Sequence, residues 1–236
     1  MRLFTGIVAF LILISSCSSY KSVVRYPSID DETFANDDLR QLFKENPRPS
    51  IVLRTPNSSD KATSNTMNSR DNTVAYNAIE KELLEEGFSV RDRGLFNEII
   101  NKSESQDYSR IKDLTNTDLI LEVINIDLNI VYSTNKMVEI FKEGREKEVI
   151  EDKDYKAKGY SIEFKIILVK TNEIAGSYKF QYKPCKDGCE IAEFNPVGRR
   201  TNDVELRESV NQNSDWENFM RESTKKLINS FRNEGK

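Results

Sequence analysis

The residues of this chain that could do chemistry are its cysteines and carboxylates, because the sequence of 236 residues contains no histidine. Histidine is the commonest general base and metal ligand, so its absence removes every Ser-His and Cys-His nucleophilic arrangement. Adjacent carboxylates could in principle do acid/base work, and they occur at Asp30-Asp31, Asp37-Asp38 and Glu85-Glu86. These pairs stand in strongly solvated stretches, and adjacent side chains point apart. We therefore expect a protein that is not an enzyme, with no catalytic residue, no cofactor and no metal site.

The N-terminus has the pattern of a bacterial secretion signal. Met1-Arg2 gives a short positive start, and residues 3–14 form an apolar run. The run is too short for a spanning helix, which needs about 20 apolar residues. It ends in Ile14-Ser15-Ser16-Cys17, which resembles the lipobox of lipoprotein signal peptides. The resemblance implies cleavage before Cys17 and acylation of Cys17 by several chains such as palmitate. Several acyl chains at one residue anchor a protein stably to a membrane. The alternative is an ordinary signal peptide with an incidental cysteine.

Two further cysteines, Cys185 and Cys189, flank a Lys-Asp-Gly turn. In an oxidising envelope compartment this spacing predicts a local disulfide. The alternative is a metal-binding pair, which would need further ligands that are missing here. A loop this short contributes less than the ~3 kcal/mol expected of a longer one, so we expect the disulfide to shape a loop.

The composition favours one core with polar excursions. Apolar residues make up 37% of the chain and charged residues 31%, with both signs interspersed and a net charge of −4. Such a mixture offers no basic face, so we expect no nucleic-acid partner. The expected organisation is a signal peptide at 1–16, the acylated cysteine with a tether and a short helix at 17–48, and an α/β (α+β) domain at 49–236 with polar excursions at 56–72, 136–155 and 185–214.

Residues 73–126 form the unit around which the other elements are arranged. A helical stripe at 73–86 ends at Gly87, as a glycine after a helix would end it. A short strand, a second helix and a long strand from Leu119 follow. We further predict a tether at 18–25, a helix within 30–46 capped by Asn36 or Asp37, a first strand at 50–55, a hairpin of strands at 159–171 and 174–182, and a terminal helix at 215–232.

The order of these elements on a lipoprotein resembles the CsgG-like family. The resemblance rests on Glu82-Leu83-Leu84-x-x-Gly87-Phe88-x-Val90-x-Asp92-Arg93-x-Leu95, on Asn97-Glu98-Ile99-Ile100 and on Thr117-Asp118-Leu119-Ile120-Leu121. That family takes in the curli production assembly/transport lipoprotein and, more distantly, the lipoprotein activator of penicillin-binding proteins. The resemblance implies a single mixed-sheet domain with helices packed on it and an anticodon-binding-domain-like core.

Asp92 and Arg93 close a predicted strand directly before a helix. A carboxylate there can accept hydrogen bonds from free N–H groups of the helix, and the arginine can pair locally. A cap and an ion pair are therefore the structural interpretation. A role for both residues in an interaction with a partner is the alternative.

Together these features predict a lipid-anchored bacterial envelope protein without enzymatic activity. We expect it in the outer membrane on the periplasmic side, bound to the membrane by its N-terminal lipid and to an envelope protein as a binding or assembly module. The alternative is a ring-forming homo-oligomer, a subunit of a curli-type outer-membrane secretion channel, whose relatives each donate two amphipathic hairpins to the membrane. The charge density at 136–155 disfavours that alternative, because charged side chains near the bilayer midplane cost several kcal/mol.

Overall fold

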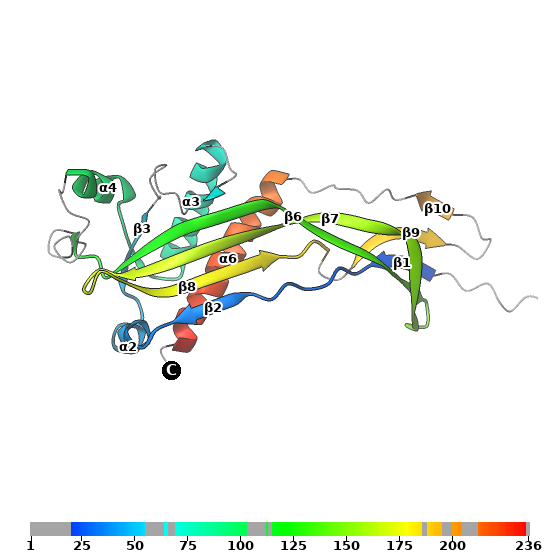
Figure 1. The fold of residues 1–236 in the computed structure, drawn as a ribbon, viewed down its shortest axis with the longest axis horizontal. Helices are drawn as coiled ribbons and strands as arrows, with labels where there is room; N and C mark the ends of the chain where they lie inside the picture. Colours follow the sequence, from blue (N-terminus) through cyan, green and yellow to red (C-terminus); the bar gives the residue numbers. More distant parts are fainter. Residues whose placement is uncertain are drawn as a thin grey trace, which may run out of the picture. The chain divides into compact units, whose positions relative to one another are not determined.

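The structure is a computed structural model, and it describes residues 20–54, 64–65, 69–102, 112, 115–185, 188–194, 200–203 and 212–234. The fold is α+β, a mixed sheet with helices packed on it, which confirms the predicted class (Figure 1). The chain divides into two compact units. The first, here called the strand unit, takes in described residues of Met1–Ser28, Val131–Ala157 and Lys183–Ser209; the second, the helix unit, takes in those of Ile29–Ile130, Lys158–Tyr182 and Val210–Lys236.

The sheet of the helix unit is mixed. Its strand order is β5-β3-β6-β7-β8-β2, with β4 also beside β6. Strand β3 is parallel to β5 and to β6, whereas β8 is antiparallel to β7 and to β2. The bounds are β2 Glu32–Ala35, β3 Ser50–Arg54, β4 Ser64–Asn65, β5 Ser89–Arg91, β6 Leu119–Phe141, β7 Glu146–Leu168 and β8 Glu173–Tyr182.

Helices cover the two faces of this sheet unequally. The large core contains side chains of α2 (Asp37–Glu45), α3 (Ser69–Glu85) and α6 (Gln212–Glu234) together with Leu119 and Leu121 of β6. Ile120 points to the opposite face, since successive strand residues alternate. There it packs in a smaller cluster with Phe96 of α4 (Arg93–Lys102).

Phe231 of the terminal helix lies at the centre of the large core. Its ring stacks on Phe43 at 4.4 Å and meets Tyr178 and Phe88 edge-on at 5.6 and 6.4 Å. Such edge and offset pairs favour one arrangement of the rings beyond the burial of their area. The predicted terminal helix is confirmed, and its apolar side chains are all buried, namely Trp216, Phe219, Met220, Leu227, Ile228 and Phe231.

Two helix ends follow the sequence signals. The side chain of Asn36 accepts a hydrogen bond from the backbone N–H of Leu39 at 2.9 Å, so Asn36 is the N-cap of α2. Gly87 follows the end of α3 with a φ of 85°, a left-handed conformation that glycine adopts without steric cost.

The strand unit is antiparallel, in the order β10-β9-β1-β6-β7. Strand β1 lies between β6 and β9, and Tyr20 is opposite both Phe141 and Phe194. Strands β6 and β7 join in a hairpin within the polar excursion predicted at 136–155, and its turn is closed by a hydrogen bond from the N–H of Phe141 to the carbonyl of Arg145 at 2.9 Å. The further bounds are β1 Tyr20–Val24, β9 Cys189–Phe194 and β10 Arg200–Asp203.

The tether predicted at 18–25 is wrong for its greater part, because Tyr20–Val24 is strand β1. Ser22 and Val24 point to one face and Val23 to the other, and all three are buried. A strand covered on both faces shows no alternation of apolar and polar residues. The polar residues Lys21 and Ser22 further weakened the sequence pattern of this strand. The prediction that 50–55 is the first strand is also wrong, since β1 and β2 precede it.

Two predicted excursions also contain regular structure. The segment 56–72 includes β4 and the start of α3, and 185–214 includes β9, β10 and the start of α6. Strands β4 and β9 pair with strands far away in the sequence, β4 with β6 and β9 with β1, as in Asn125 opposite Ser64. Local periodicity carries no signal for such pairing. Cys17 and the signal peptide lie outside the described residues.

Candidate interaction sites

Asp92 lies between β5 and α4, and Arg93 is the first residue of the helix. The Oδ1 of Asp92 accepts a hydrogen bond from the N–H of Leu95 at 2.6 Å, which makes Asp92 the N-cap of α4. Arg93 lies 3.6 Å from Glu80 of α3, and its guanidinium carbon is 5.2 Å from the ring centre of Tyr76. Burial raises the pKa of Glu80, and the positive charge of Arg93 opposes that rise. The structure thus places both residues in a local cap and ion pair, while their role toward a partner stays a prediction.

Asp118 ties three strands together at one end of the helix unit. Its Oδ2 accepts hydrogen bonds from the N–H and the hydroxyl of Ser50, at 3.0 and 2.8 Å. Its backbone carbonyl accepts a hydrogen bond from the N–H of Val169 at 3.0 Å. Asp118, directly before β6, therefore holds β3, β6 and the end of β7 together.

A cleft of about 190 Å³ lies beside Asp118. Its charged side chains are of both signs, with Asp38 and Glu45 from α2 opposite Lys170 in the turn after β7. Asp118 also lines it, but its carboxylate is already held by Ser50. The full lining is Asp38, Gln41, Leu42, Glu45, Lys112, Asp118, Leu168, Lys170 and Thr171. The surface of the cleft is about equally polar and apolar.

A buried charge cluster crosses the sheet face on which α4 packs. The carboxylate of Glu122, of which only 2% is exposed, pairs with the guanidinium of Arg54 and, at 2.5 Å, with the ammonium of Lys165. Arg54 and Glu122 are register partners on β3 and β6, and Lys165 comes from β7. Sequence reasoning missed this cluster, because the three residues are more than 40 positions apart and carry no local pattern. Removal of one member of such a buried cluster leaves the other charges uncompensated, which costs about 3–5 kcal/mol.

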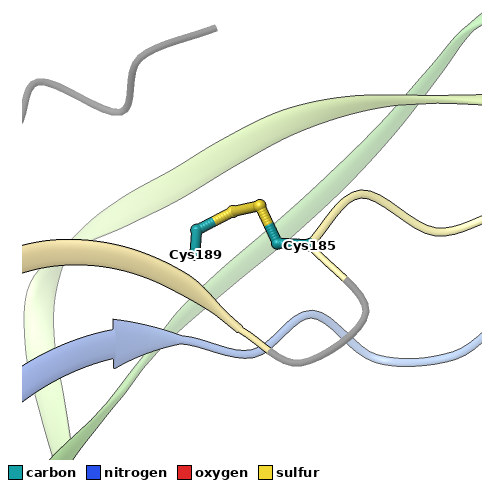
Figure 2. The surroundings of a disulfide bond; sticks show 2 residues. All are labelled: Cys185 and Cys189. Carbon is teal, nitrogen blue, oxygen red and sulfur yellow. A yellow bond between two sulfur atoms is a disulfide. The ribbon is translucent and has the colours of Figure 1, made fainter. Parts of the chain in front are cut away.

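The predicted disulfide between Cys185 and Cys189 is present, with their Cα atoms 5.0 Å apart (Figure 2). The bond excludes the alternative of a metal-binding cysteine pair. Gly188 adopts a φ of 105° in this loop, and its N–H donates to the carbonyl of Cys185 at 2.8 Å. Cys189 then opens β9 opposite Val24 of β1. The disulfide therefore shapes the entry to β9. Within the described ranges, no group of three or more Asp, Glu or Cys side chains could hold a metal ion.

The hairpin segment of β7 is an open sheet edge. Strand β8 pairs with β7 only from Tyr160 to Leu168, so in the strand unit β7 has β6 as its one neighbour among the described strands. An edge strand leaves the N–H and C=O groups of every second residue free to pair with another chain. On this edge Ile150 is 68% exposed, and Asp152 and Asp154 are exposed beside it.

The chain matches no protein-family model and no curated protein. Among solved structures it is similar to the PelC dodecamer from Paraburkholderia phytofirmans, with a TM-score of 0.39 and 9% identity over 86% of this chain and 96% of that one. It is also similar to a neuraminyllactose-binding hemagglutinin homolog from Helicobacter pylori, with a TM-score of 0.34 and 15% identity over 86% and 92% of the two chains. Likenesses at this level carry no argument about function. The resemblance to the CsgG-like family stays a prediction. None of the helices in the described part of the chain is both long and apolar enough to cross a membrane.

Proposed function

We propose that this chain is a lipid-anchored bacterial envelope protein that binds another envelope protein through the open edge of β7 and catalyses no reaction. The lipobox that ends at Cys17 supports the anchor. The disulfide between Cys185 and Cys189 supports an oxidising compartment, since such bonds persist outside the cytosol. The expected location is the periplasmic side of the outer membrane.

The observation that carries the binding role is the open edge of β7 in the strand unit, residues 146–157. A partner strand can add to such an edge, its main-chain hydrogen bonds providing affinity and its side chains providing specificity. Unprotected edges are a hazard for aggregation, and charged side chains are a common protection. This edge is both open and charged, which suits a selective partner.

The charges on the edge define the partner that it fits. Glu146 is paired with Arg25, and Glu148 with Lys136 at 3.0 Å. Asp152 and Asp154 are exposed and take part in no ion pair within the described part of the chain. A partner strand with basic residues opposite these two carboxylates would gain opposite-charge cross-strand pairs.

The test is photo-crosslinking in the intact envelope, with a benzophenone amino acid in place of Ile150. The matched control is the same substitution at Val138, which is half-exposed in the same unit but belongs to β6 at a point where β1 pairs on one side and β7 on the other. A discrete crosslinked partner at position 150 and none at 138 is the expected result. Equal crosslinking at both positions, or none at either, would contradict binding through this edge.

A second function, the ring-forming subunit of a curli-type secretion channel, is favoured by one observation. The sheet of the strand unit has a second outer strand, β10, on the side opposite β7. Two different edges on one molecule allow head-to-tail contacts between copies, which close into rings. A crosslink from position 150 to a second copy of this chain, together with a large oligomer in mild detergent measured by light scattering, would support the ring and displace the first proposal.

A further inference from the structure

We propose that the strand unit stands on the membrane with one end, formed by Tyr20, Phe141 and the β6–β7 turn at 142–145, in the headgroup layer of the lipids. The inference rests on the proposed function, because it takes the acylation of Cys17 as its premise.

The distance in sequence between the lipid and the sheet is short. Only Ser18 and Ser19 separate Cys17 from Tyr20, where β1 begins. Three residues of extended chain span about 11 Å at most. Acyl chains on Cys17 place that residue at the lipid surface, so the start of β1 lies at most about 11 Å from it, a distance comparable to the headgroup layer, which is about 5 to 8 Å thick. A flexible tether, which the sequence had suggested, would have left the orientation open.

The register of the strands brings other segments to the same end of the strand unit. Strand β1 is antiparallel to β6, and Tyr20 is opposite Phe141, the last residue of β6. The turn from β6 to β7 therefore lies at the end where the anchored chain enters. On the other side of β1, Tyr20 is opposite Phe194, and Arg200 of β10 is in turn opposite Phe194.

This end of the strand unit carries aromatic and basic side chains. The rings of Tyr20 and Phe141 lie 5.6 Å apart, and both side chains are half-buried. The guanidinium carbon of Arg145 lies 4.6 Å from the ring centre of Phe141, and Lys142 in the same turn is exposed. Aromatic rings with a polar edge and long basic side chains are the groups that settle at membrane–water interfaces.

The charge balance favours the same surface. The turn carries Lys142 and Arg145 against one acidic residue, Glu143. The next carboxylate, Glu146, is neutralised by the two hydrogen bonds from Arg25. The excess of positive charge is attracted to anionic headgroups, an attraction that extends over about a Debye length.

The test uses the acylated full-length chain on vesicles of phosphatidylcholine and phosphatidylglycerol. With Cys17 acylated and Cys185 bonded to Cys189, an introduced cysteine is the one free thiol for a fluorescent label. Lys142→Cys places the label in the turn. Asn135→Cys is the matched control, because Asn135 is exposed on the same strand six residues before Phe141, about 20 Å along it. The measurement is quenching of each label by lipids with a nitroxide in the headgroup.

We expect the label at position 142 to be quenched at least threefold more strongly than the label at position 135. Flotation with the vesicles reports separately on the anchor. A chain that floats with equal quenching at both positions, or none at either, would overturn this inference and leave the lipid anchor standing. A chain that does not float would overturn both. A shift in the emission wavelength of the label at position 142, measured in the absence of vesicles, would show that another part of the protein covers this end. That result would also contradict the proposal.

Discussion

Arg25 and Glu146 form a doubly hydrogen-bonded ion pair in the strand unit, with Nη1 of Arg25 2.7 Å from Oε2 and Nη2 2.6 Å from Oε1. The pair joins the segment after β1 to the first residue of β7. The hydrogen bonds from Arg25 hold the pKa of Glu146 below its ordinary value of 4.5, and the charge of Arg25 adds to the effect. The two side chains are on the surface, so salt weakens the attraction between them.

The first prediction concerns acid unfolding. Because the folded chain lowers the pKa of Glu146, it binds fewer protons than the unfolded chain as the pH falls through the unfolded-state value. The contribution of this ion pair to the free energy of unfolding is complete above pH 4.5. It is lost as the pH drops through the lower pKa that Glu146 has in the folded chain. Glu146→Gln should therefore lose less stability than the wild type between pH 5 and the acid limit, measured by urea unfolding. Glu143→Gln in the adjacent turn is the control, and equal pH slopes for Glu146→Gln and the wild type would contradict the prediction.

The second prediction concerns Glu122. Its removal in Glu122→Ala leaves Arg54 and Lys165 without their shared carboxylate on a largely buried face, so we expect the free energy of unfolding to fall by about 3 kcal/mol. The triple variant Arg54→Met, Glu122→Leu, Lys165→Met removes all three charges and should regain most of that loss. Denaturant titration of the three proteins measures both effects. A triple variant less stable than Glu122→Ala would show that the charges stabilise the fold in their own right.

The third prediction separates the two interpretations of Asp92. If the residue serves as the cap of α4, Asp92→Ala should cost about 1 kcal/mol and Asp92→Asn much less, since asparagine also caps. Thermal unfolding provides the comparison. If Asp92 instead contacts a partner, capture of that partner would weaken in both variants while their stability stayed at the wild-type level.

The fourth prediction concerns the disulfide. Replacing Cys185 and Cys189 by serine should lower the free energy of unfolding by about 2 kcal/mol, because a loop this short removes little entropy from the unfolded chain. The same loss should follow from reduction of the wild type with dithiothreitol, whereas the serine variant should not respond to it. Thiol alkylation of the chain as it is extracted from the envelope measures the native redox state. Full alkylation without prior reduction would argue against an oxidising compartment.

Local patterns in the sequence predicted the elements whose stabilising contacts recur every few residues. The stripe of α3 with its stop at Gly87, the apolar face around Phe231 and the hairpin of β7 and β8 all belong to this group. Strand β1 could not be predicted in this way, because its neighbours β6 and β9 lie more than 110 residues further along the chain. A strand buried on both faces has no alternation to show.

The candidate sites also differ in whether a short stretch of sequence could predict them. Cys185 and Cys189 are four residues apart, so their pairing could be predicted from spacing and compartment. Glu122 meets Arg54 and Lys165 only after three strands have aligned, and no short window contains them. Whether β7 is an edge strand likewise depends on which other strands pair with it, and the residues of β7 do not show this.

The placement of β1 between β6 and β9 has a mechanical consequence. If Cys17 is held in a bilayer, any pull between cell surface layers enters the fold at Tyr20 and runs along the axis of β1. The hydrogen bonds of both ladders lie across that axis, so the load would be shared by all of them at once instead of opening them one at a time. A protein fastened in this manner should resist extraction by force applied at its N-terminus far better than by the same force applied at the end of α6, a difference that single-molecule pulling from the two termini would measure.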